Sequence, residues 1–196
     1  LDADALNGGV NDSDLDVSAA RLRISSGGTV GSTGNHLETS VATVSARSVD
    51  SIYLLESDAI SVGDVGIVAN RVRTNATSTQ PAAATDDPQS DLRTSGANAS
   101  IVLRTLAGSI TLSNGSAPGA QTSPTDDISI SAGTGGNVLI EAGVTSGDST
   151  SDITVGADVV GVAGNVSLVA SRSVALTGTA DVRTTSVGVA SGSIDL

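Results

Sequence analysis

The chain contains no cysteine, methionine, tryptophan or phenylalanine among its 196 residues. Without cysteine, neither a disulfide bond nor a thiolate metal site is available. Tyr53 is the only aromatic residue, yet hydrophobic residues still make up 38% of the chain. The core must therefore be built from valine, isoleucine, leucine and alanine, which suits many similar thin layers better than a centre packed around large rings.

Positive charge is also scarce, because lysine is absent and nine arginines stand against 21 acidic residues, a net charge of −12. Nucleic acids and anionic membrane surfaces both require a dense cationic face, so the composition argues against either partner. No stretch approaches the ~18 uninterrupted apolar residues of a membrane-spanning helix, and no membrane insertion is expected. An acidic surface keeps an extended protein soluble and can bind Ca²⁺.

A short phrase recurs in the second half of the chain, as "GSITL", "GNVLI", "GNVSL" and "GSIDL". Its first residues are separated by a constant step of 28, at Gly108, Gly136, Gly164 and Gly192. Ile24 and Ile52 are also 28 residues apart, whereas the interval from Ile52 to Ile110 is two steps plus two residues. A fixed period predicts a repeat architecture, here about six coils of which one is imperfect.

Within each step, apolar and polar residues alternate over short runs that glycine, serine, asparagine and aspartate interrupt. This pattern predicts short β-strands. We therefore expect an all-β fold, a parallel β-helix (solenoid), right-handed by base rate, in which each coil stacks on the next. The inward positions expected to form its core are Ile52, Leu54, Ile110, Leu112, Val138, Ile140, Val166 and Leu168. The four glycines are expected to turn the chain at a corner, and Asn165 to stack on Asn137 with hydrogen bonds along the ladder.

A β-sandwich adhesin domain is the alternative fold, since short strands and frequent turns fit it as well. A sandwich does not, however, explain a constant step in one strand. We expect residues 1–196 to form a single β-helix segment, with a loop-rich imperfect coil over residues 74–99. That coil contains Pro81–Asp91, and a second excursion covers Asn114–Asp127; both contain prolines, which cannot donate to a ladder.

The phrases "GNVSLVASRSVALTGTADVRTT" and "GSITLSNGS" resemble the repeat regions of filamentous-haemagglutinin-like and related very large bacterial surface exoproteins. Coils in that family are often shorter than 28 residues. The resemblance implies a secreted, cell-surface rod that acts in attachment to cells or surfaces. Its implied partners are neighbouring segments of the same long chain and a cell-surface glycan or protein receptor. The chain starts without a signal peptide and ends as a new repeat begins, so we expect a piece of a longer protein.

Carboxylates are the candidate metal ligands. Asp12, Asp14 and Asp16 alternate in "NDSDLD", but an EF-hand loop would require glycine at position 17 and glutamate at 23, where the chain has Val17 and Arg23. Adjacent carboxylates can chelate Ca²⁺, although turn formation is the commoner reason for such aspartates. The candidate pairs are Asp86 with Asp87 and Asp126 with Asp127.

No catalytic site is expected. His36 is the only histidine, and a single histidine in a glycine-rich turn lacks the partner nucleophile that base catalysis requires. Tyr53 should face outward if Ile52 and Leu54 face inward. The sequence therefore favours a non-enzymatic structural and adhesive rod without a cofactor. A carbohydrate-binding or polysaccharide-degrading β-helix and a Ca²⁺-stabilised spacer are the alternatives.

Overall fold

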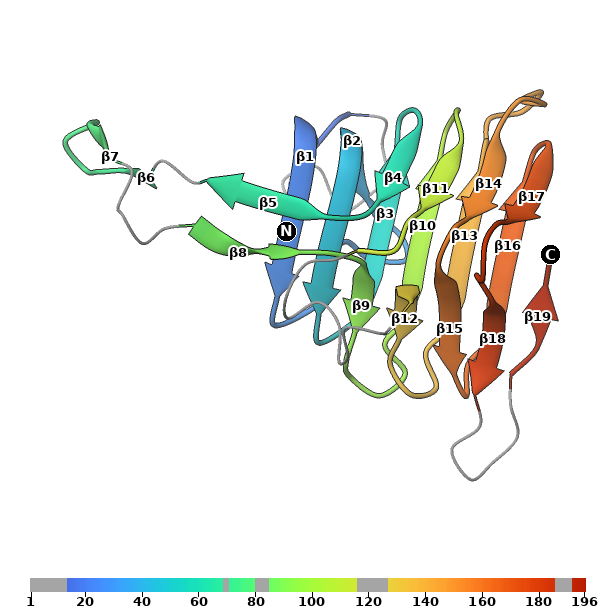
Figure 1. Cartoon of the computed structure of the whole chain (residues 1–196). Coiled ribbons are helices and arrows are strands. Elements are labelled where there is room, and N and C mark those ends of the chain that lie inside the picture. Colours follow the sequence, from blue (N-terminus) through green and yellow to red (C-terminus); the bar gives the residue numbers. More distant parts are fainter. Residues whose placement is uncertain (1–13, 69–70, 80–84, 116–126, 186–191) are drawn as a thin grey trace.

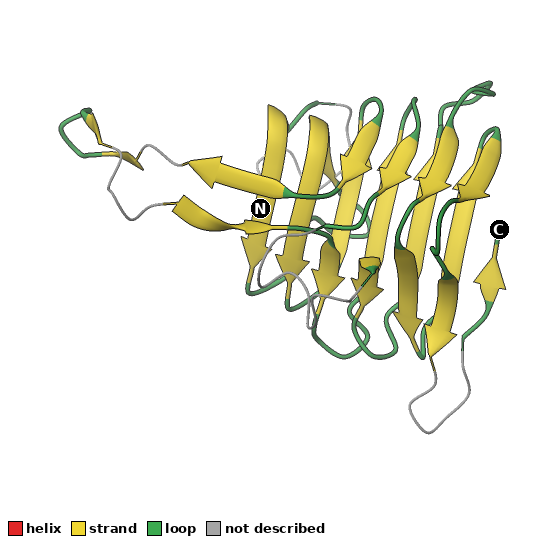
Figure 2. Ribbon diagram, in the orientation of Figure 1, coloured by secondary structure: helices red, strands yellow, loops and turns green. Residues whose placement is uncertain are grey.

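The computed structural model of the chain describes residues 14–68, 71–79, 85–115, 127–185 and 192–196. These residues form an all-β fold, dominated by one large curled sheet in which parallel strands of successive coils lie side by side (Figure 1). Strands and connecting loops account for the described residues (Figure 2), and no helix among them could cross a membrane. The parallel β-solenoid predicted from the repeat is therefore confirmed, and the sandwich is not the fold.

The strands fall into three ladders, which each coil visits in the same order. Ladder A contains β3 (Ile52–Glu56), β10 (Ile101–Thr105), β13 (Val138–Ala142), β16 (Val166–Ala170) and β19 (Ile194–Asp195). Ladder B contains β4 (Ile60–Val62), β11 (Ile110–Leu112), β14 (Asp152–Val155) and β17 (Ser173–Leu176). Ladder C contains β9 (Leu92–Thr94), β12 (Ile128–Ala132), β15 (Asp158–Val162) and β18 (Val182–Thr185).

The N-terminal strands are longer than the rest. β2 (Leu37–Ser48) pairs with β3, β4 and β9 in turn, so a single strand runs through all three ladders. β1 (Val17–Ser26) pairs with β2 in parallel along its length. These two strands form one end of the solenoid, and the strands near the C-terminus form the other (Figure 1).

The core is a stack of aliphatic side chains. In-register parallel pairing places like residues above one another, and alternation points every second residue inward. In ladder A, Ile52, Ile101 and Val138 are consecutive register partners. The eight predicted core residues are all at most 2% exposed: Ile52, Leu54, Ile110, Leu112, Val138, Ile140, Val166 and Leu168. Thin layers of this kind fill the interior without a large aromatic ring.

The constant 28-residue step is correct only for the last coils, where Val138 pairs with Val166 and Val166 with Ile194. Ile110 lies in ladder B beside Ile60 and Ile153, and is not stacked on Val138 as predicted. Ile24 pairs with Ala46 in ladder C instead of with Ile52. Insertions of different lengths explain the error: ladder A advances by 49 residues from Ser51 to Ser100 and by 37 from Ser100 to Asn137.

The expected loop-rich coil contains an antiparallel arm. β5 (Val65–Val68) pairs with β8 (Thr85–Gln89), and β6 (Arg71–Val72) pairs with β7 (Ser78–Thr79). In Figure 1 the arm passes in front of β1 and β2 and extends beyond the solenoid. The sequence-based interpretation of Pro81–Asp91 as a loop was thus wrong for β8, which contains Pro88. A two-stranded arm has only edge strands, where proline is tolerated.

Candidate functional site

The corner before ladder A carries a column of polar side chains, each of which bonds to the next coil. Ser51 Oγ accepts the backbone N–H of Ser100 at 2.9 Å, and Ser100 Oγ accepts that of Asn137 at 3.0 Å. Asn137 Oδ1 accepts the N–H of Asn165 at 2.9 Å, and Asn165 Oδ1 accepts that of Ser193 at 2.8 Å. The column thus links each coil to the next by one hydrogen bond at this corner. Each of its members is a serine or an asparagine directly before the first inward aliphatic residue of a ladder A strand.

The glycines next to this column serve a different purpose from the one predicted. A Cβ on Gly164 would lie 1.8 Å from the carbonyl oxygen of Gly136, and one on Gly192 would lie 1.9 Å from that of Gly164. A Cβ on Gly136 would likewise lie 2.0 Å from the carbonyl oxygen of Ala99. The backbones of Gly136, Gly164 and Gly192 are not left-handed, whereas Gly108, before ladder B, has φ 86°. Close approach of successive coils therefore requires glycine at positions 136, 164 and 192, and only Gly108 is required by the geometry of a turn.

The predicted Ca²⁺ ligands are not brought together by the described part of the fold. Asp12 and Asp126 lie outside the described residues. Asp16 Oδ2 accepts the backbone N–H of Glu38 at 3.1 Å, while Asp14 is exposed. Asp127 Oδ2 accepts the Thr179 hydroxyl at 3.0 Å. Asp86 and Asp87 belong to strand β8 and not to a loop. Among the described residues, no group of three or more His, Cys, Asp or Glu side chains could hold a metal ion.

The two longest insertions leave the solenoid at the same place. The arm joins β4 to β9, and residues 113–127 join β11 to β12, so both lie between ladder B and ladder C in successive coils. In the next coil the same junction is only Gly156 and Ala157. The two longest insertions therefore leave from the same edge of the solenoid, and the ladders continue past them.

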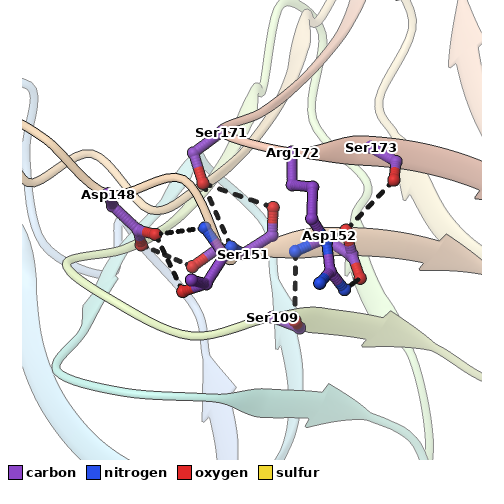
Figure 3. A network of polar contacts seen from close by, with 8 residues as sticks. Ser109, Asp148, Ser151, Asp152, Ser171, Arg172 and Ser173 are labelled. Carbon is purple, nitrogen blue, oxygen red and sulfur yellow. Dashed lines mark hydrogen bonds and ion pairs between the residues drawn. The ribbon is translucent and has the colours of Figure 1, made fainter.

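The loop between β13 in ladder A and β14 in ladder B is organised by one carboxylate (Figure 3). Asp148 Oδ1 accepts the backbone N–H of Thr150 at 2.7 Å and its hydroxyl at 3.0 Å, and Oδ2 accepts the Ser151 hydroxyl at 2.5 Å. These hydrogen bonds, that from Ser151 foremost, lower the pKa of Asp148 to about 2. The carboxylate is held mainly by hydrogen bonds from its own loop, so it shapes the loop and is not poised to exchange a proton near neutral pH.

Asp152, also shown in Figure 3, joins three coils through its backbone N–H and its carboxylate. The backbone N–H of Asp152 donates to Ser109 Oγ at 3.0 Å, in the preceding coil. Its side chain pairs with both Nε and Nη2 of Arg172 in the following coil, and Ser173 Oγ donates to Oδ1 at 3.1 Å. The hydrogen bonds from Arg172 lower the pKa of Asp152. This arrangement is a polar column before ladder B, comparable to the one before ladder A.

The only histidine and the only aromatic residue lie against each other on the outer side of ladder A. The rings of His36 and Tyr53 meet edge to face, with centroids 5.9 Å apart. Burial lowers the pKa of His36, and the positive charge of Arg104 lowers it further. The sequence does not predict that the two rings meet, because nothing in the local pattern indicates that the segment before Leu37 returns to β3.

Comparisons with known proteins add no identification: no family model, curated protein or solved structure matches the chain.

Proposed function

We propose that this chain is a non-enzymatic, structural segment of a secreted bacterial surface protein, and that its stacked coils hold insertions in position for attachment to a cell or surface. The observation that carries the proposal is the shared exit of the two longest insertions, both between ladder B and ladder C. Insertions on a repeat architecture commonly gather on its binding face. The resemblance of residues 164–185 to haemagglutinin-like exoproteins supports the same function.

The solenoid has the properties that a rigid support needs. Parallel in-register ladders connect each coil to the next through backbone hydrogen bonds along three faces. Polar columns at the corners add further bonds between coils, such as the Ser100 N–H to Ser51 Oγ and the Asn165 N–H to Asn137 Oδ1. Coil-on-coil contacts of this kind resist bending, because bending would break several columns together.

The arm offers a polar surface for contact. Residues 73–77 are exposed and form a turn in which Arg73 N–H donates to Thr77 O at 2.9 Å. Asn75 Oδ1 fixes the turn by accepting the Thr77 N–H at 3.1 Å and its hydroxyl at 2.7 Å. A turn that is ordered before binding loses less conformational freedom when it docks. A surface glycan or a polar patch on a protein receptor is the ligand chemistry that suits it.

The test compares the full chain with a variant in which residues 66–88 are replaced by Gly-Ala, copied from the junction at Gly156 and Ala157. Circular dichroism and urea unfolding show whether the variant keeps the solenoid. Both proteins are then immobilised and assayed for binding to cells, to a glycan panel and to matrix proteins. We expect the full chain to bind at least one surface and the armless variant to lose most of that binding. Binding of neither protein to any surface, or equal binding of both, would contradict the proposal.

A further inference from the structure

The chain contains several Asn-x-Ser/Thr triplets, the acceptor sequence of N-linked glycosylation. They begin at Asn11, Asn75, Asn98, Asn114 and Asn165. Asn11 and Ser116, the third residue of the Asn114 triplet, lie outside the described residues. The other three triplets have very different surroundings. Because modification requires an exposed amide in a segment that a transferase can reach, the structure can select among them.

The solenoid holds two of these triplets in place. Asn165 Oδ1 accepts the Ser193 N–H at 2.8 Å and its Nδ2 donates to Asn137 Oδ1 at 3.1 Å, so both its oxygen and its nitrogen are engaged. The Asn98 triplet ends at Ser100, whose Oγ accepts the Asn137 N–H in the corner column. Both triplets run directly into strands of ladder A, β10 and β16, which cannot open without breaking the ladder.

Asn75 lies at the end of the arm, in the turn between β6 and β7. Figure 1 shows this turn beyond the edge of the solenoid, and residues 73–77 are exposed. Two residue pairs, Arg71 with Thr79 and Val72 with Ser78, join β6 to β7. A ribbon this short opens locally at little cost. A transferase can therefore reach the Asn75 triplet without disturbing the ladders.

The amide of Asn75 is oriented by the third residue of its own triplet. Its Oδ1 accepts the backbone N–H of Thr77 at 3.1 Å and the Thr77 hydroxyl at 2.7 Å, which forms an Asx-turn. The Ala76 N–H donates to Arg73 O at 2.8 Å and completes the turn. Both bonds to the amide go to its oxygen, and Nδ2 has no hydrogen-bond partner among the described residues. The nitrogen that would receive a sugar is thus left uncommitted on an exposed residue.

This arrangement suits the chemistry of N-glycosylation. A neutral amide nitrogen is a weak nucleophile, because its lone pair is delocalised onto the oxygen. When a proton leaves Nδ2, negative charge collects on Oδ1, where the two donors of Thr77 stabilise it. Nδ2 then attacks the anomeric carbon of an activated sugar. The N–C bond forms as the bond from that carbon to a phosphate oxygen breaks. The phosphate leaves with the electron pair, and a base of the transferase takes the proton.

We propose that Asn75 is a site of N-linked glycosylation, and that its co-substrate is a sugar activated by a phosphate leaving group, as a nucleoside diphosphate or as a lipid pyrophosphate. Thr77 positions the amide and is not itself modified. The attached glycan would project from the end of the arm, away from the three ladders (Figure 1). The inference does not rest on the proposed function, because its test measures the mass of a peptide and not binding to a surface.

The test offers the folded full chain to two enzymes that accept any Asn-x-Ser/Thr triplet. One is an oligosaccharyltransferase with a lipid-linked glycan, and the other is a soluble N-glycosyltransferase with a nucleoside-diphosphate hexose. Mass-spectrometric peptide mapping gives the rate at each triplet, and synthetic peptides 71–79 and 161–169 give the rates without the fold. We expect Asn75 to react in the chain within about threefold of its rate in the peptide, and Asn165 to react at least about tenfold more slowly than in its peptide. The enzyme that modifies Asn75 identifies the class of donor.

Variants of the triplet test the role of the Thr77 hydroxyl. Thr77→Val removes the hydroxyl but keeps the backbone N–H, and it should slow modification of Asn75 at least tenfold. Thr77→Ser keeps a hydroxyl and should restore most of the rate. Ser167→Ala removes the hydroxyl of the Asn165 triplet and is the matched control, which should leave the rate at Asn75 unchanged. Circular dichroism shows whether each variant keeps the solenoid.

The natural state of the site is read by mapping the protein purified from the organism that produces it, where Asn75 should carry a hexose or a longer glycan. An unmodified Asn75 in that protein would overturn the proposal. So would the absence of modification at Asn75 in the folded chain, equal rates at Asn75 and Asn165 in that chain, or an unchanged rate in Thr77→Val.

Discussion

The side-chain oxygen of Asn137 accepts two hydrogen bonds from Asn165, one from its backbone N–H at 2.9 Å and one from its side-chain amide at 3.1 Å. Asn165 then accepts the N–H of Ser193. Each oxygen in the column thus faces the later coil, and the amide of Asn165 faces the earlier one. The corner therefore has a direction, and the two asparagines are not equivalent.

This asymmetry predicts different effects for two substitutions that change the net charge equally. Asn137→Asp keeps an oxygen that accepts both bonds from Asn165, so its unfolding free energy should change by less than about 0.5 kcal/mol. Asn165→Asp loses the amide donor and places a carboxylate oxygen against Asn137 Oδ1, which should cost about 0.5–1.5 kcal/mol at this exposed position. Urea midpoints of the two variants measure the difference. Equal midpoints would show that the side-chain bond between the asparagines contributes nothing.

Gly164 is the position where the spacing between coils is most constrained. Gly164→Ala would place a methyl group 1.8 Å from the Gly136 carbonyl oxygen, which is backbone and cannot turn aside. The coils would have to separate, and we expect a loss of about 3 kcal/mol or more. Gly34→Ala is the matched control, because a Cβ there meets nothing within 4 Å. Calorimetric melting of both variants tests the prediction, and a stable Gly164→Ala protein would contradict the close stacking.

The alternation of apolar residues was sufficient to predict which side chains point inward, because period two reports the pleat of a strand wherever the strand lies. It was not sufficient to predict which ladder a strand joins. "GSITL" and "GNVSL" read alike, yet Ile110 lies in ladder B and Val166 in ladder A. Gly108 and Ser109 precede ladder B just as Gly192 and Ser193 precede ladder A, so the local sequence does not distinguish these two corners.

Contacts between distant segments were beyond the reach of sequence reasoning. The arm was missed because β5 to β8 are short and their alternation is weak. Arg47 and Arg93 are neighbours only because the arm between them is an insertion that leaves the ladder register intact. A fixed period is visible only where coils have equal length, and the coil that carries the arm departs from it.

Glu56 is a buried carboxylate that no charge pattern indicated. It is fully shielded from solvent, where it accepts the Thr39 hydroxyl at 2.7 Å and the Val41 N–H at 3.0 Å. Both donors belong to β2 where it passes from ladder A toward ladder B. Glu56→Ala would leave these two donors buried without an acceptor and should cost about 2–4 kcal/mol.

The titration of Glu56 should be visible in the pH dependence of stability. Burial raises the pKa of Glu56, although the bonds from Thr39 and Val41 oppose the shift. A raised pKa in the folded state contributes stability that is fully present below the unfolded pKa of ~4.3 and is lost as pH rises through the folded pKa. Urea unfolding at several pH values should therefore show the wild type losing stability relative to Glu56→Gln over that window. A constant difference across the series would contradict a raised pKa.

The opposite shift is expected at Asp148, where hydrogen bonds lower the pKa to about 2. The Ser151 hydroxyl, at 2.5 Å, is the largest cause, so Ser151→Ala should raise the pKa of Asp148 toward its usual value of ~3.9. Thr150→Val removes only a weaker hydroxyl donor and keeps the backbone N–H, so it should raise the pKa less. Because the folded pKa is depressed, this contribution to stability is present above pH ~3.9 and is lost as pH falls through about 2. Carboxyl carbon shifts in an NMR titration measure each value. An ordinary pKa for Asp148 in the wild type would show that the hydrogen bonds in Figure 3 do not persist in solution.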